Sequence, residues 1–121
     1  MSELKGKIDF TLFISATNAN PNGDPLNGNR PRINMDGYGE ISDVCIKRKI
    51  RNRLQDRNQK IFVQSDDKTD DSYTSLKDRA DSCEELKKEM SNKKSANRDV
   101  CAAIACNEWF DVRAFGQVFA F

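Results

Sequence analysis

Three cations, Lys47, Arg48 and Arg51, lie at spacings that place them on one face of a helix. Lysine and arginine side chains grouped in this way can contact the phosphates of a nucleic acid. Residues 46–60 contain seven bases and one acid, an excess that repels itself unless a polyanion compensates it. The alternative is a solvated face, which most basic helix surfaces are.

A helix is expected over residues 43–54, which contain no glycine or proline. Ser42 is a favourable N-cap residue, and an acid follows it in the first turn. Ile46, Ile50 and Leu54 recur at intervals of four and predict an apolar stripe that faces the core. The three cations would then face water.

A long polar stretch, residues 18–40, precedes this helix and holds all three prolines and six asparagines. Such a composition predicts a long ordered loop, although a mobile surface loop is the alternative. Arg30 and Arg32 lie in it and can extend the cationic surface of the helix. Residues 18–24 imitate the start of a calcium-binding loop, but Asn29 stands where a bidentate glutamate is required, so no metal site is expected.

Two further segments alternate between apolar and polar residues and predict strands at 7–16 and 112–121. Residues 75–88 predict a mostly acidic helix, and Asn97 can cap a second helix over 98–105. Two strands cannot build a closed sheet, and the chain stops on the apolar Phe121. We therefore expect a chain cut short of its natural end.

The composition excludes several classes of site. The net charge of +1 averages the basic helix with an acidic segment and says nothing about partners by itself. The four cysteines form no CxxC pair and histidine is absent, which excludes a disulfide scaffold, a zinc site and histidine-based catalysis. No cofactor is expected. Without a signal peptide or a long apolar run, we expect a cytoplasmic protein with no membrane contact.

Three blocks of the sequence, ANPNGDPLNGNRPRI, ISDVCIKRKIRNRL and WFDVRAFGQVF, resemble the Csd/Csh group of CRISPR-associated RAMP proteins. These are the repeated backbone subunits of type I Cascade surveillance complexes. The resemblance implies an α+β fold, a ferredoxin-like RNA-recognition palm with a helical insertion. It assigns residues 1–63 to the first palm strand, loop and basic helix, 64–97 to a finger insertion, and 98–121 to a helix and the start of a further palm strand. Family members run more than twice as far.

The resemblance also implies a function, which is sequence-independent binding of a CRISPR guide RNA in antiviral defence. Copies of the chain would assemble along the RNA with other Cascade subunits and present its bases to target DNA. The implied RNA-binding residues match the family's Ser-x-x-x-x-Lys-Arg-x-x-Arg helix and the loop before it: Asn20, Asn22, Arg30, Arg32, Ser42, Lys47, Arg48 and Arg51.

The resemblance thus implies that the protein is not an enzyme. Two alternatives remain open. Backbone subunits of the related type III complexes cut target RNA with an acid in the loop before the basic helix. Asp24 and Asp36 are positioned for such metal-dependent cleavage. The other alternative is a protein-interaction module in which the acidic helix and the basic helix each dock a partner.

Overall fold

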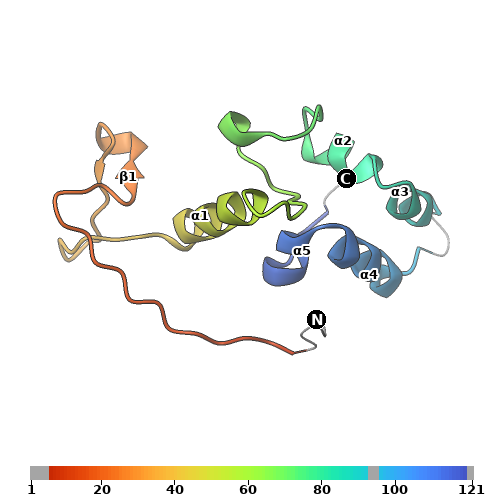
Figure 1. Ribbon diagram of the computed structural model, residues 1–121, viewed down its shortest axis with the longest axis horizontal. Helices are drawn as coiled ribbons and strands as arrows, with labels where there is room; N and C mark the ends of the chain where they lie inside the picture. The colour runs from red at the N-terminus through yellow and green to blue at the C-terminus, as the bar shows by residue number, and fades with distance from the viewer. Residues whose placement is uncertain (1–5, 93–95, 120–121) are drawn as a thin grey trace. The chain divides into compact units, whose positions relative to one another are not determined.

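The computed structural model describes residues 6–92 and 96–119 as a small mixed α/β protein (Figure 1). The described residues form a two-stranded sheet and five α-helices. By its contacts the chain divides into two compact units, Met1–Ser42 and Asp43–Phe121. The ferredoxin-like palm and the domain boundaries expected from the sequence stay predictions.

The first unit is organised by two short turns within the long polar stretch. Strand β1 (Gly23–Asp24) pairs antiparallel with β2 (Arg30–Pro31), and the 3-10 helix η1 (Pro25–Asn27) connects them. The Asp24 carboxylate accepts a hydrogen bond from the Leu26 N–H at 3.1 Å and caps η1. Gly28 ends the turn in the left-handed region, at φ 60°, where glycine is favoured.

The second turn of this unit is fixed by one asparagine. The Asn34 side-chain oxygen accepts hydrogen bonds from the N–H groups of Asp36 at 3.0 Å and Tyr38 at 2.9 Å. Such a side-chain mimic of a backbone turn is typical of asparagine. An isolated bridge between Ile33 and Gly39 closes the turn. The stretch predicted to be an ordered loop is therefore held by its own backbone and asparagine side chains.

The strand predicted over residues 7–16 is wrong for the described chain. These residues form no strand, and Figure 1 shows them as a long open trace. Their apolar side chains are exposed, with Phe13 at 92%. The residues alternate as they do in strands, but a strand forms only when another strand pairs with its backbone, and the described part of the chain supplies none here.

The second unit has a helical core. Helices α2 (Leu76–Asp81), α3 (Glu84–Ser91), α4 (Arg98–Glu108) and α5 (Phe110–Phe115) pack one against the next in chain order (Figure 1). The Phe62 ring lies at the centre, with its centroid 4.7 Å from that of Trp109 and 5.2 Å from that of Phe119. The buried apolar cluster is Phe62, Ala80, Leu86, Ala105, Trp109 and Val112.

Two helix starts predicted from the sequence are confirmed by their caps. The Ser75 hydroxyl accepts a hydrogen bond from the Asp78 N–H at 3.0 Å, and the Asn97 side chain accepts one from the Asp99 N–H at 2.9 Å. The single helix expected over 75–88 is instead broken between α2 and α3 at Ser82 and Cys83. Helix α4 continues past the expected end, to Glu108.

The strand predicted over residues 112–121 is also wrong within the described residues. Residues 112–115 belong to α5, and 116–119 form no strand. Trp109 and Val112 lie three residues apart, a helical spacing that puts both in the core. Gly116, at φ 75°, then ends the helix. Residues 120 and 121 lie outside the described part of the chain.

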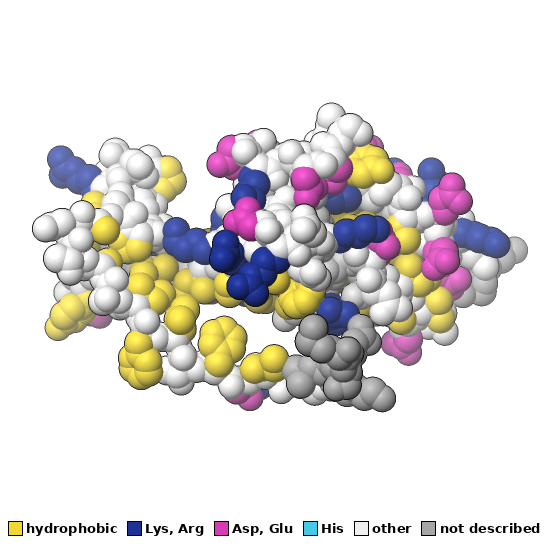
Figure 2. Space-filling model, viewed as in Figure 1, with side chains coloured by type: hydrophobic (Ala, Val, Ile, Leu, Met, Phe, Trp, Pro, Cys, Tyr) yellow, Lys and Arg dark blue, Asp and Glu magenta, His cyan; other side chains and the backbone are white. Residues whose placement is uncertain are grey.

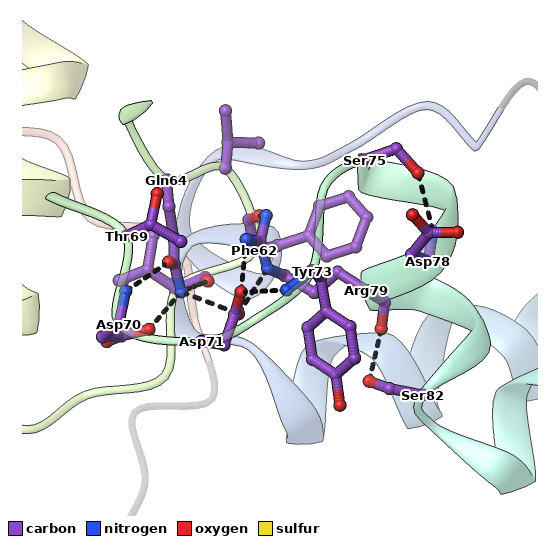
Figure 3. Close-up of polar contacts among 12 residues, drawn as sticks. Phe62, Gln64, Thr69, Asp70, Asp71, Tyr73, Ser75, Asp78, Arg79 and Ser82 are labelled. Carbon is purple, nitrogen blue, oxygen red and sulfur yellow. Dashed lines mark hydrogen bonds and ion pairs between the residues drawn. The ribbon is translucent and has the colours of Figure 1, made fainter. Parts of the chain in front are cut away.

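A buried arginine fixes the segment that leads into this core (Figure 3). Arg79 donates to both carboxylate oxygens of Asp71, at 2.7 and 2.8 Å, and to the Phe62 carbonyl at 2.8 Å. Fork-shaped pairing of this kind is the strong form of an ion pair. It holds Phe62 in place from the side of α2.

This ion pair predicts a pH dependence of stability. The hydrogen bond from Arg79 lowers the pKa of the Asp71 carboxyl below its usual value. The pair therefore stabilises the fold at pH above about 4, and this contribution is lost as the pH falls through the lower pKa of the folded state. We expect the urea midpoint to fall more steeply between about pH 5 and pH 2 in the natural chain than in Asp71→Asn. Parallel curves for the two proteins would contradict this.

No helix among the described residues is long and apolar enough to span a membrane.

Candidate nucleic-acid interface

The basic helix predicted from the sequence is confirmed as α1 (Asp43–Gln55). Its apolar stripe does not pack as expected, because Ile46, Ile50 and Leu54 are each only partly buried. The apolar cluster of described residues draws no member from α1. Other contacts must therefore help to hold the helix against the rest of the second unit.

Arginines provide that attachment. Arg51 Nε donates to Asp111 Oδ2 at 2.9 Å, and Arg48 Nη1 donates to the Val63 carbonyl at 2.8 Å. The Arg51 side chain is 13% exposed. The two guanidinium groups predicted to face solvent thus lie on the side of α1 that contacts the rest of the unit. Of the excess charge within residues 46–60, that of Arg51 is paired with an acid sixty residues along the chain.

Asp111 is the acceptor that holds Arg51. It is 1% exposed, and its Oδ1 accepts a hydrogen bond from the Phe62 N–H at 2.7 Å. Its Oδ2 accepts from the Val63 N–H at 3.1 Å and from Arg51. Burial lowers the pKa of the neighbouring Arg48 guanidinium, and the like charge of Arg51 adds to this while Asp111 opposes it. Arginine nonetheless stays charged at neutral pH.

An aromatic ring on α5 lies close to two of the predicted cations. The Arg51 guanidinium carbon lies 5.1 Å from the centroid of the Phe115 ring, and Lys47 Nζ lies 5.8 Å from it. Both distances are in the range of cation–π attraction. Lys47 also pairs with Asp43 one turn earlier at 3.0 Å, and its side chain is 40% exposed. The three cations that the sequence grouped are therefore grouped in the structure, as a partly buried cluster.

A second set of cations on α1 is exposed. Lys49 and Arg53 lie four residues apart on the helix, and the Arg53 side chain is 69% exposed. Figure 2 shows Lys and Arg side chains gathering over α1. Arg53 lies 4.0 Å from Asp56, a long contact between solvated groups that is worth little. Lys49 and Arg53 therefore form an ordinary solvated basic face.

The end of α1 is also held by polar contacts. Gln55 is buried, and its Nε2 donates to the Lys68 carbonyl at 3.0 Å and to the Asp70 carboxylate at 3.2 Å. Lys68 in turn pairs with Asp56. The helix is thus fixed along its length by hydrogen bonds and charges.

The remaining predicted site residues lie in the first unit, and two of them, Asn22 and Ser42, form a hydrogen-bonded frame. The Asn22 side-chain oxygen accepts from the Ser42 N–H and from the Ser42 hydroxyl, both at 2.9 Å. Asn20 Nδ2 donates to the Asn29 carbonyl at 2.8 Å. This frame ties the loop to the residue before α1. The structure brings these residues together, as it does Lys47, Arg48 and Arg51, but the two sets belong to different units.

The two predicted arginines of the loop are exposed. Arg32 pairs with Glu40 at 3.1 Å, and Arg30 lies on β2. Asp24, a candidate for metal-dependent cleavage, caps η1 as described above, and Asp36 is exposed in the Asn34 turn. Within the described residues, no group of three or more His, Cys, Asp or Glu side chains could hold a metal ion.

One charged residue central to this interface, Asp111, was not found from the sequence, and neither was the buried Arg79 that fixes Phe62. The signal for Asp111 is an acid inside the apolar run Trp109–Val112, because such a carboxylate is buried only with partners. The signal for Arg79 is weaker, since its surroundings in sequence are polar.

Comparison with known proteins identifies the family. A family model described as CRISPR-associated protein Cas7 matches residues 6–121. The chain belongs to the Cas7 family. A CRISPR-associated protein Cas7 from Haloferax volcanii is 48% identical over 54 residues. That stretch is 43% of this Cas7-family chain and only 16% of the relative.

Proposed function

We propose that this Cas7-family chain binds the backbone of a CRISPR guide RNA without reading its sequence. In this proposal it is a repeated, non-enzymatic backbone subunit of a type I Cascade complex of the Csd/Csh group. Other copies of the chain, further Cascade subunits and target DNA paired to the guide are its proposed partners. The proposal rests on family membership together with one observation, the clustering of Lys47, Arg48 and Arg51.

The clustered cations suit a phosphate surface because they are held in place and still have donors to offer. Each guanidinium carries five N–H groups, and the described hydrogen bonds use one each from Arg48 and Arg51. A cation that is already ordered loses less entropy when it binds a phosphate. Such contacts position a nucleic acid without sequence information.

The test is the binding of labelled single-stranded RNA across a salt series. Three single-strand phosphate contacts predict a slope of log affinity against log salt of about −2. Lys47→Gln with Arg48→Gln keeps the Arg51–Asp111 ion pair and removes two proposed contacts. We expect the slope to fall to about −0.7 with any RNA sequence.

The matched control is Lys49→Gln with Arg53→Gln, which removes the same charge from the outer side of the same helix. We expect it to keep most of the slope. If it loses as much as the first variant, RNA binds the helix by general attraction and the proposed contacts are wrong. If the natural chain shows no salt-dependent binding, the proposal fails for this chain. Association with other proteins that survives RNA digestion would favour the interaction-module alternative.

A further inference from the structure

The block WFDVRAFGQVF has no part in the proposed RNA contacts, yet it holds the residue on which α1 depends. Asp111 is a fully buried carboxylate at the start of α5. A buried charge is stable only with several donors, and this one has three: two backbone N–H groups and Arg51. The two backbone donors fix the carboxylate relative to the core. The third links it to α1.

The two helices meet through matched pairs of side chains. Asp111 and Phe115 are four residues apart on α5, and Lys47 and Arg51 are four residues apart on α1, so each pair lies on one face of its helix. Asp111 holds Arg51, while the Phe115 ring lies near both cations. Because α1 adds nothing to the apolar cluster, these contacts, together with that of Arg48 to the Val63 carbonyl, hold its cations in place.

We propose that Asp111 is a positioning residue for RNA binding, which acts by fixing Arg51 and through it the cationic side of α1. This inference rests on the proposed function. In this role the negative charge of Asp111 favours the binding of a polyanion. Asp111 itself does not contact RNA, since its oxygens are taken up by Arg51 and the backbone.

The sign of one substitution separates this role from general electrostatics. Asp111→Asn removes a negative charge beside the proposed RNA surface, so attraction alone predicts tighter binding. Positioning predicts weaker binding, on the order of tenfold, because a charge-assisted hydrogen bond that orders Arg51 is lost. We expect the salt slope to become shallower by about 0.7, the value of one single-strand phosphate contact.

A double-mutant cycle with Arg51→Gln tests whether Asp111 acts through Arg51. We expect Asp111→Asn to have little further effect on RNA affinity once Arg51 is replaced. An equal loss in both backgrounds would overturn the inference, as would unchanged or tighter binding of Asp111→Asn. If the natural chain binds no RNA at all, it is the proposed function that fails.

Two more variants keep the test decisive if Asp111→Asn unfolds, which the fluorescence of the single tryptophan, Trp109, would report. Phe115→Leu removes the ring beside Lys47 and Arg51 without leaving a buried charge, and we expect weaker RNA binding with a folded core. Full affinity in Phe115→Leu would overturn the inference. The matched control is Asp71→Asn, which disrupts the other charged contact to the Phe62 region and should leave RNA affinity unchanged in the folded protein.

Discussion

Phe62→Ala is expected to lower the free energy of unfolding by about 3–5 kcal/mol. The ring is completely buried between Trp109 and Phe119. Its backbone is held at the N–H by Asp111 and at the carbonyl by Arg79, so the surroundings cannot easily close over the cavity. A cavity that stays open puts the cost at the upper end of this range. Urea unfolding followed by Trp109 fluorescence measures the loss.

The control for this substitution is Phe13→Ala. Phe13 is in the exposed segment of the first unit, so removal of its ring should leave the urea midpoint of the second unit nearly unchanged. A loss under about 1 kcal/mol for Phe62→Ala would mean that the site collapses and that Phe62 is not the centre of the core.

Arg79→Ala is expected to cost a similar amount, about 3–5 kcal/mol, for an electrostatic reason. It leaves the Asp71 carboxylate without its counter-charge and the buried Phe62 carbonyl without its donor. Arg79→Met with Asp71→Asn removes both charges and keeps the apolar volume of the arginine stem. We expect this double variant to be more stable than Arg79→Ala, as measured by urea unfolding.

Arg53→Ala serves as the comparison for an exposed ion pair. Its side chain lies 4.0 Å from Asp56 in solvent, and its removal should change stability by no more than about 0.5 kcal/mol. Equal losses in Arg53→Ala and Arg79→Ala would contradict the importance given to burial.

The parts of the fold that were predicted correctly are those encoded by neighbouring residues. Helix α1 and the caps at Ser75 and Asn97 depend on signals within a few positions of each helix start. The ordered loop likewise depends on asparagine side chains that bond their own backbone, as Asn34 does. Such interactions can be read from a sequence because both partners lie in it side by side.

The two strand predictions that were wrong depend on more than neighbouring residues. The alternation in residues 7–16 indicates a strand only if a second strand is present, and pairing is not a local property. The run Val112–Phe115 is mostly apolar, a pattern that fits a buried helix as well as a strand. The neighbouring Trp109, which packs in the core with Val112, and Gly116, which ends α5, favour the helix.

For the candidate site, the grouping of Lys47, Arg48 and Arg51 was predicted from spacing alone, but their surroundings were not. The helical wheel places Ile46, Ile50 and Leu54 opposite the cations and so predicts that the apolar side is buried. The structure instead places Arg48 and Arg51 on a side that contacts the rest of the unit, because Asp111 and the Val63 carbonyl lie there as acceptors. A partner sixty positions away cannot be inferred from a window of fifteen residues.

The polar docking of α1 also sets the thermodynamic character of its attachment. Apolar burial makes the heat capacity of unfolding large and the response to urea steep. Since α1 adds no side chain to the apolar cluster, its release from α5 carries a smaller share of either quantity than the helical core does. Ionic strength acts on its exposed and partly exposed charges, and hardly at all on the helical core. The outer charges of this helix therefore respond to salt, whereas the buried Arg51–Asp111 pair that holds it to α5 is screened little.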